Sequence, residues 1–194
     1  RSVYSFCMCP GGTVVAAALE AVLALQHDVI ACGPGLGRGS AVTEFVRGLL
    51  DRSTIPLILD ADALTVLADD PSALEGRDER VVIITPHPGE MARLIGVSVD
   101  EVQANRMQVA ADFAAARRVY VVLKGHRTII ATPEGRVFIN PTGNAGMATG
   151  GTGDVLTGMI AAWLAQLLDA EAACQLAVFL HGAAGDLAAD SHGA

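Results

Sequence analysis

The chain has 194 residues, of which 52% are hydrophobic and only 4% aromatic, so Ala, Val, Leu and Ile must build its core. That length is enough for one α/β domain. The formal net charge is −8 and Lys124 is the single lysine, which argues against binding to a nucleic-acid backbone. The four cysteines have neither zinc-site nor disulfide-framework spacing, so reduced thiols in a cytoplasmic protein are the simplest interpretation.

Short apolar strands alternate with helices along the chain. The predicted strands are residues 3–9, 28–32, 56–59, 81–84 and 119–123, followed by a hairpin of residues 128–131 and 136–139. The predicted helices are residues 14–26, 41–52, 63–67, 88–96, 98–118, 154–167 and about 170–189. This alternation predicts an α/β/α sandwich whose central sheet is mainly parallel, with a late antiparallel hairpin.

The last two predicted helices are apolar nearly all round, so we expect both to be largely buried. Charged and polar residues interrupt the longest apolar run, residues 164–187, and we predict no membrane span. The first ten residues are too short for a secretory signal and resemble a strand entered midway. We therefore expect a single domain over residues 1–194 that is truncated at both termini.

A glycine-rich segment, residues 140–158, is the most distinctive part of the chain. Five of the eleven residues from Gly143 to Gly153 are glycine, and the segment joins a predicted strand to a predicted helix. Backbone N–H groups that glycines leave uncovered, together with those of the helix start, form a binding site for an anion such as phosphate. Asp154 at the junction would suit a base for a hydroxyl that attacks phosphate, or it could simply cap the helix.

Four further loops follow predicted strands, at the sheet edge where ligands bind in parallel sheets. They are GPGLGR after Cys32, DADA after Leu59, TPHPGE after Ile84 and KGH after Leu123. The GPGLG loop could be a tight turn or an imperfect dinucleotide fingerprint, because its third glycine position holds Arg38.

Asp60 and Asp62 alternate along a strand end, so one could face a cleft while the other caps a helix at Ala63. Glu90 could order a water on Mg²⁺ or complement a helix dipole. His87 could donate to a substrate oxygen or lie free on the surface.

Lys124 could be a solvated surface lysine or serve a ligand, and Arg127 and Thr128 could meet a nucleotide's ribose or phosphates. His181, inside an apolar helix, is interpreted as a satisfied core histidine.

With these loops, the sequence resembles the NAD(P)H-hydrate dehydratases within the ribokinase-like superfamily. The motifs ACGPGLGR, LILDADAL, ITPHPGEMARL, VLKGHRTII and NPTGNAGMATGGTGDVLTGMIAA appear in family order, and QLAVFLHGAAGDLAA resembles the closing helix. The resemblance implies a ribokinase-like fold and ADP- or ATP-dependent dehydration of the S form of hydrated NADH or NADPH, with Mg²⁺. ADP is the first choice of donor, and a homo-oligomer, often a tetramer, is implied.

The resemblance also implies roles for individual residues. Asp154 would act as the base at the hydroxyl of the hydrate. The transferred phosphoryl group would be stabilised by Gly150, Gly151 and Gly153. The hydrated dinucleotide would be contacted by Gly35, Gly37, His87 and Asp154. The adenine nucleotide would be contacted by Lys124, Gly125, His126, Arg127, Thr128, Asn144 and Gly153. Glu90 would support Mg²⁺ through water.

The chain departs from the family in lacking early strands and a G-x-x-G-A-A segment that lines the substrate site. An epimerase domain often precedes the dehydratase in this family. Two alternatives to the dehydratase stay open: a small-molecule kinase of the same superfamily, acting on a vitamin-precursor alcohol, and a non-catalytic nucleotide-binding scaffold.

Overall fold

The computed structural model describes residues 17–77, 80–166 and 169–192, and its strands form one sheet. Strand order in the sheet follows chain order. The strands are β1 (Ile30–Cys32), β2 (Leu57–Leu59), β3 (Val82–Ile84), β4 (Tyr120–Leu123), β5 (Ile129–Ala131) and β6 (Val137–Ile139). Strands β1 to β4 are parallel, whereas β5 pairs antiparallel with both β4 and β6. The predicted parallel sheet with a late hairpin is therefore confirmed.

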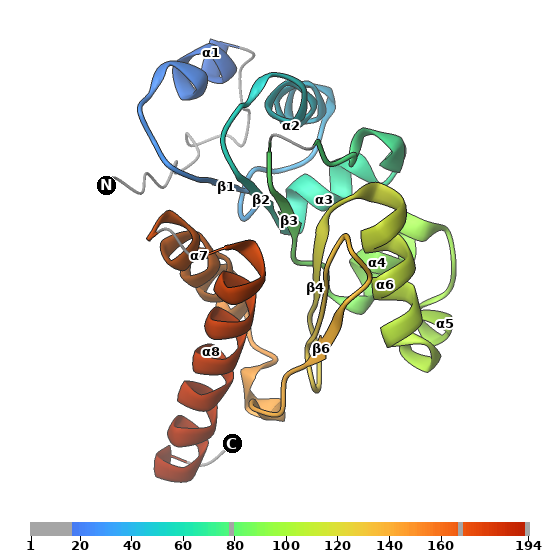
Figure 1. Cartoon of the computed structure of the whole chain (residues 1–194), viewed down its shortest axis with the longest axis vertical. Coiled ribbons are helices and arrows are strands. Elements are labelled where there is room, and N and C mark those ends of the chain that lie inside the picture. The colour runs from blue at the N-terminus through green and yellow to red at the C-terminus, as the bar shows by residue number, and fades with distance from the viewer. Residues whose placement is uncertain (1–16, 78–79, 167–168, 193–194) are drawn as a thin grey trace.

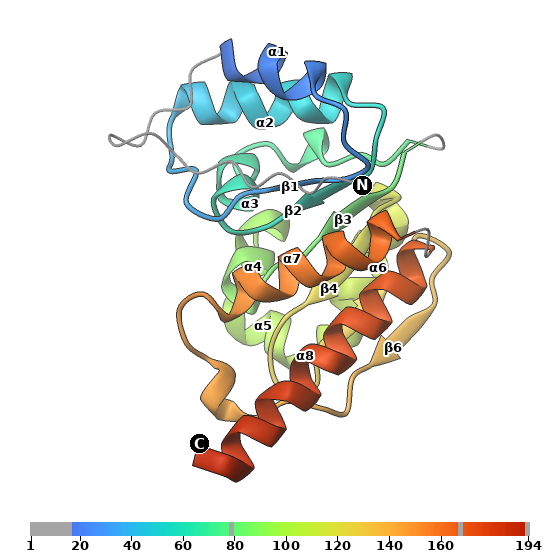
Figure 2. The ribbon, with the colours of Figure 1, turned by 90° about the vertical axis from the view of Figure 1, so that its left-hand side faces the viewer.

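Helices cover both faces of this sheet (Figure 1). They are α1 (Ala17–Ala24), α2 (Ser40–Arg52), α3 (Ala61–Leu67), α4 (Pro88–Ile95), α5 (Val99–Ala104), α6 (Arg106–Arg117), α7 (Thr152–Ala165) and α8 (Ala170–His192). Two single-turn 3₁₀ helices are η1 (Pro71–Ala73) and η2 (Ala145–Met147). Figure 2 shows α7 and α8 crossing one face of the sheet, with α3 to α6 behind it and α2 above β1.

Alternation along the buried strands divides the core into two layers. Leu57 and Leu59 pack with α2, α3 and α4, whereas Ile58 between them packs with α7 and α8. Because successive strand residues point to opposite faces, a three-residue strand serves both layers. This pattern produces the predicted α/β/α sandwich.

Several predictions on individual elements need correction or stay untested. The predicted strand 3–9 and the start of the first helix lie outside the described residues. The helix predicted over residues 98–118 divides at Asn105, whose φ of −130° ends α5 before α6 begins. The dinucleotide-fingerprint interpretation is wrong, because the described strands run in unbroken chain order without the reversal of a Rossmann sheet.

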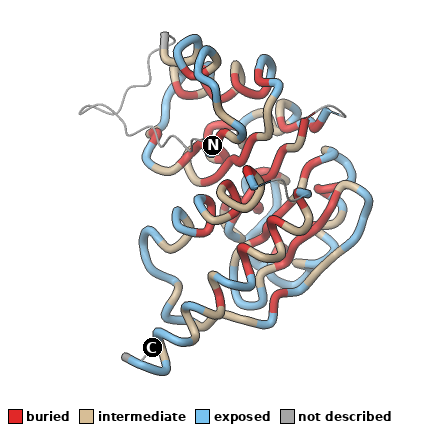
Figure 3. Tube along the Cα trace, turned by 60° about the vertical axis from the view of Figure 1, so that its left-hand side comes forward, coloured by how far each residue is buried: buried red, intermediate tan, exposed pale blue. Residues whose placement is uncertain are grey.

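The expectation that both closing helices are largely buried is wrong for α8. Its side chains Phe179, Leu180 and Leu187 are 47%, 38% and 68% exposed, and Val155 on α7 is 57% exposed. Figure 3 shows mostly intermediate and exposed residues toward the C-terminus. Residues 170–191 have the length and mean hydropathy, 1.2, of a membrane span, and 28% of that stretch is buried, so the absence of a membrane span stays a prediction.

The cysteines of the described part, Cys32 and Cys174, are free and buried. Burial raises the pKa of Cys32 to about 12 and also raises the pKa of Cys174. Neither thiol is therefore a reactive thiolate at neutral pH.

A buried arginine caps the C-terminal end of α2 by donating hydrogen bonds to its carbonyl oxygens. Arg80 is 5% exposed, and its Nη1 donates to the carbonyl oxygens of Leu50 at 2.6 Å and Ser53 at 2.9 Å. These carbonyls have no partner within the helix, so the guanidinium satisfies acceptors that would otherwise be buried alone.

We predict that Arg80→Met destabilises the fold by about 2 kcal/mol, because it leaves these buried carbonyls unpaired. The melting temperature measured by circular dichroism should fall by about 4–8 °C. Arg52→Met, which removes only an exposed ion pair with Glu20, is the control and should shift it much less. Equal shifts in both variants would contradict this role for Arg80.

Candidate active site

The loops after β1 and β2 pack tightly together at the carboxyl edge of the sheet. A Cβ on Gly33 would lie 1.7 Å from the carbonyl oxygen of Asp60, so only glycine fits there. The Gly37 N–H donates to Asp62 Oδ2 at 2.9 Å, and Arg38 Nε lies 3.4 Å from Asp62 Oδ1. GPGLG is therefore a tight turn that holds Gly35 and Gly37 beside the end of β2.

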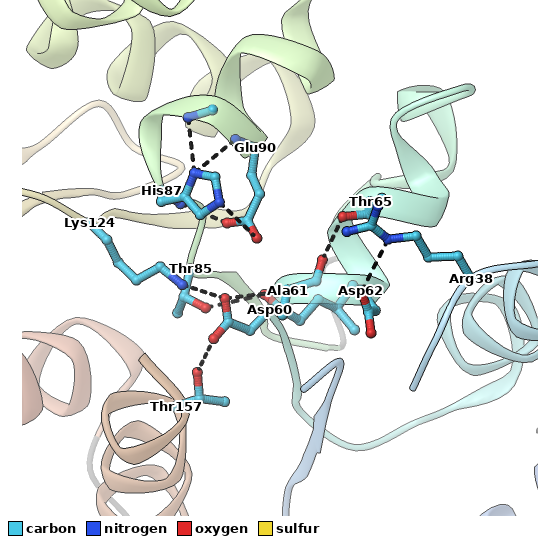
Figure 4. A network of polar contacts seen from close by, with 12 residues as sticks. Arg38, Asp60, Ala61, Asp62, Thr65, Thr85, His87, Glu90, Lys124 and Thr157 are labelled. Atoms are coloured by element: carbon cyan, nitrogen blue, oxygen red, sulfur yellow. Dashed lines mark hydrogen bonds and ion pairs between the residues drawn. The ribbon is translucent and has the colours of Figure 1, made fainter. Parts of the chain in front are cut away.

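Asp60 takes the capping role expected of one of the two aspartates, but at 1% exposed it does not face a cleft (Figure 4). Its Oδ1 accepts from the Ala61 N–H at 2.8 Å and caps α3, which begins at Ala61 rather than at Ala63. The same oxygen lies 2.6 Å from Lys124 Nζ, and Oδ2 accepts from Thr157 Oγ1 at 2.8 Å. Asp60 is 1% exposed and Thr157 is buried, whereas Lys124 at the other end of the network is only half-buried.

Lys124 is therefore no surface lysine, since its side chain is 19% exposed and paired with Asp60. A Cβ on Gly153 would lie 3.3 Å from Lys124 Nζ. The ammonium group thus lies directly against the first turn of α7.

The start of α7 is open and has no side-chain cap. Gly151 is the N-cap with φ 88°, and added Cβ atoms on Gly150 and Gly151 would meet nothing within 4 Å. Asp154 lies exposed in the first turn, so the interpretation of Asp154 as the helix cap is wrong. The unpaired backbone N–H groups of this turn carry the positive end of the helix dipole.

A pocket of about 610 Å³ opens beside this turn, within the size range of ligand sites. Its lining includes eight of the predicted site residues: His87, Lys124, Gly125, His126, Arg127, Thr128, Asn144 and Gly153. The predicted residues outside the lining are Gly35, Gly37, Glu90, Gly150, Gly151 and Asp154. The predicted nucleotide-binding set is thus brought together, while the predicted substrate-binding glycines lie elsewhere on the same sheet edge.

The α8 wall of the pocket was missed by sequence reasoning. His181 lines the pocket and is only half-buried, so its interpretation as a core histidine is wrong. Asp186 accepts from the Gly143 N–H at 2.8 Å and from Asn144 Nδ2 at 3.0 Å, which fixes the glycine-rich loop on α8. A methyl on Gly182 would lie 2.2 Å from Thr142 Oγ1, so a glycine is needed at this contact.

Arg106, also missed, fixes the loop between β4 and β5. Its guanidinium donates to the backbone carbonyls of Leu123, Lys124 and His126. Burial lowers the pKa of Arg106 from its ordinary value, yet the group stays charged at neutral pH. This arginine therefore shapes one wall of the pocket from the start of α6.

His87 and Glu90 form a capping box at the start of α4. Nδ1 of His87 accepts from the N–H groups of Gly89 at 3.0 Å and Glu90 at 3.2 Å. Because Nδ1 is an acceptor, Nε2 is the donor of this ring, and it lies 3.5 Å from Glu90 Oε1. Glu90 is 7% exposed and burial raises its pKa above the ordinary value, although the His87 N–H and Lys124 oppose that change.

The described residues contain no group of three or more His, Cys, Asp or Glu side chains that could hold a metal by itself. A cation near Glu90 would offset the cost of burying that carboxylate. The donor set therefore fits a Mg²⁺ ion held mainly by ligand phosphates and water, with Glu90 as an outer partner.

Solved structures support a ribokinase-like α/β fold. A ribokinase from Thermotoga maritima shares it at a TM-score of 0.56 and 17% identity, over 81% of this chain and 50% of that one. An ADP/ATP-dependent NAD(P)H-hydrate dehydratase from Bacillus subtilis, co-crystallized with ATP/Mg²⁺, is far more similar. Its TM-score is 0.81 at 43% identity, over 91% of this chain and 61% of that one. The chain belongs to the NAD(P)H-hydrate dehydratase family, whose model matches residues 8–194.

Related sequences agree with this membership. A bifunctional NAD(P)H-hydrate repair enzyme Nnr from Moorella thermoacetica is 48% identical over 186 residues, covering 95% of this chain and 35% of the relative. An ADP-dependent (S)-NAD(P)H-hydrate dehydratase from Bacillus subtilis is 43% identical over 177 residues, covering 91% of this chain and 62% of the relative. The chain thus spans about a third to three fifths of the length of these relatives.

We predict that Gly182→Ala destabilises the protein by about 1–3 kcal/mol, because the added methyl overlaps Thr142. Gly158→Ala is the matched control, since nothing lies within 4 Å of its Cβ position. That change should stabilise α7 by about 1 kcal/mol. Urea denaturation measures both, and the same sign in the two variants would contradict the close contact between α8 and the glycine-rich loop.

Glu90 and Glu101, which complete the capping boxes at the starts of α4 and α5, should respond to pH in opposite directions. The pKa of Glu90 is raised by burial, so its contribution to stability falls as pH rises above the ordinary value of 4.5. The pKa of Glu101 is lowered by the Ser98 N–H, so its contribution is present above that value and lost in acid.

Relative to the unmodified protein, the melting temperature of Glu90→Gln should therefore increase between pH 4 and pH 7, and that of Glu101→Gln should decrease. Parallel trends in the two variants would show that burial does not control the titration of Glu90.

Proposed function

We propose that this protein catalyses the ADP- or ATP-dependent dehydration of (S)-hydrated NADH or NADPH, which restores the coenzyme. One observation carries the proposal: Lys124, the loop of residues 125–128 and the open start of α7 surround one pocket, and Asp154 lies exposed beside it. The names of the relatives, dehydratases that depend on ADP or bind ATP/Mg²⁺, support this choice of substrates.

In the proposed first step, the hydroxyl oxygen of the hydrate attacks the terminal phosphorus of the nucleotide. A new P–O bond forms to the substrate, the bond to the departing nucleotide breaks, and Asp154 accepts the hydroxyl proton. The N–H groups of Gly151 and Gly153 stabilise the transferred phosphoryl group, because they face the developing charge. Phosphate then leaves with the C–O bonding pair while a neighbouring ring carbon loses a proton, which restores the double bond.

The remaining pocket residues hold the two substrates. Residues 124–128 and Asn144 bind the adenine nucleotide, and Gly35, Gly37 and His87 bind the hydrated dinucleotide. Mg²⁺ bound to the phosphates would neutralise part of their charge, and Glu90 would orient one of its waters. A cytoplasmic homo-oligomer that binds neither nucleic acid nor membrane completes the proposal.

The direct test incubates chemically hydrated NADH with the protein, Mg²⁺ and either ADP or ATP. The proposal expects the near-ultraviolet absorbance of NADH to return together with one inorganic phosphate per coenzyme. A stable phosphate ester without restored absorbance would instead identify a small-molecule kinase. Nucleotide binding without any turnover would favour a non-catalytic scaffold.

We predict that Asp154→Ala lowers kcat by at least about 10²-fold, the usual contribution of a general base. Nucleotide affinity measured by calorimetry should stay nearly unchanged, because the carboxylate acts on the hydroxyl rather than on the phosphates. Asp112→Ala, which changes an exposed carboxylate on α6, is the control and should keep full activity. Comparable losses of turnover and nucleotide affinity would contradict the role given to Asp154.

A further inference from the structure

We infer that Asp60 is a positioning residue for phosphoryl transfer, because its carboxylate holds the ammonium group of Lys124 against the first turn of α7. The inference rests on the proposed function and deepens it. It assigns a role to a residue outside the set that the family resemblance implies.

The carboxylate of Asp60 is held in one orientation by three donors. They are the Ala61 N–H at 2.8 Å, Lys124 Nζ at 2.6 Å and Thr157 Oγ1 at 2.8 Å (Figure 4). The donors belong to the start of α3, the end of β4 and the interior of α7. Asp60 therefore joins three elements that are far apart in the sequence, at a point that is 1% exposed.

The backbone around Asp60 is strained. Ala61 has a φ of 47°, in the left-handed region that side chains disfavour. Such a conformation is disfavoured and persists only where the surrounding structure enforces it. Here the carbonyl of Asp60 packs against Gly33 while its side chain is fixed from three sides. The strained residue thus directly follows Asp60, whose carboxylate oxygen lies 2.6 Å from Lys124 Nζ.

Lys124 needs such a partner because its ammonium group lies on a flexible stem. Among the described residues, Asp60 is its only hydrogen-bond acceptor, so one of its three N–H groups is used and two remain. A Cβ atom added to Gly153 would lie 3.3 Å from Lys124 Nζ and 3.9 Å from Asp60 Oδ2. The remaining donors thus lie beside the unpaired N–H groups of α7, where phosphate oxygens would be bound.

The kinetic test compares Asp60→Asn with the unmodified protein. Asparagine keeps an acceptor for Ala61 but loses the charge that fixes the ammonium group. We expect kcat to fall by about 10²-fold, the effect of misplacing a reacting group by about 1 Å. Nucleotide affinity should hardly change, since Lys124 is retained. Asp70→Asn, which changes an exposed carboxylate paired with Arg47, is the control.

A double-variant cycle separates positioning from an independent role. If Asp60 acts only through Lys124, Asp60→Asn combined with Lys124→Ala should have the kcat of Lys124→Ala alone. Losses that multiply in the double variant would overturn the inference. So would an unchanged kcat in Asp60→Asn.

The single lysine allows a test that needs no turnover. With ¹⁵N-lysine, the protein gives one ε-ammonium NMR signal, which should move on addition of ADP and Mg²⁺. In Asp60→Asn it should shift and exchange faster with water, because the acceptor has lost its charge. If the lysine signal of Asp60→Asn is the same as that of the unmodified protein, the inference is overturned, even if hydrated NADH is converted. If the unmodified protein fails to convert the hydrate, the proposed function fails while this signal still decides the role of Asp60.

Thr157→Val provides a second variant should Asp60→Asn fail to fold. It removes one donor to Asp60 and nearly keeps the shape of the side chain. The lysine signal should move and kcat should fall. If either the signal or kcat stays unchanged, the inference is overturned.

Discussion

The ion pair between Asp60 and Lys124 is the interaction around which the site is assembled. It joins the end of β2 to the end of β4, and Thr157 links both to α7. Burying two charges removes them from water, so such a pair adds little net stability, although removing one partner is costly. Its main effect is therefore geometric. Because parallel strands end at the same sheet edge, the pair brings the loops after β2 and β4 together under the open start of α7.

Local sequence pattern was sufficient to predict the sandwich, whereas most of the pocket residues were implied by the family resemblance. Apolar strand runs predicted a mainly parallel sheet, although not the order of its strands, and residues 124–128 and Asn144 do line one cavity. Long-range pairing could not be predicted, because Asp60 lies 64 residues from Lys124 and 97 from Thr157. The exposure of α8 was missed for a related reason: composition shows that a helix is apolar, but only packing shows which of its faces is covered. Arg106 and His181 likewise acquire their roles from elements that meet only in the fold.

Family membership and the geometry of the site are separate observations, and both point to phosphoryl transfer from a nucleotide. The family model covers residues 8–194, and the Bacillus subtilis structure has the same fold over 91% of this chain. Independently, the open α7 start, the half-buried Lys124 and the exposed Asp154 form an arrangement suited to moving a phosphoryl group onto a hydroxyl. The predicted substrate-binding Gly35 and Gly37 lie outside the pocket, on the part of the sheet edge next to β1.

The most direct test of the account is a crystal structure of this protein with ATP and Mg²⁺. The account predicts that oxygens of the terminal phosphate lie within hydrogen-bonding distance of Lys124 Nζ and of the N–H groups of Gly151 and Gly153. It also predicts that Asp154 faces the solvent side of that phosphate. A terminal phosphate bound away from the first turn of α7, with Lys124 still turned toward Asp60 alone, would contradict the central claim.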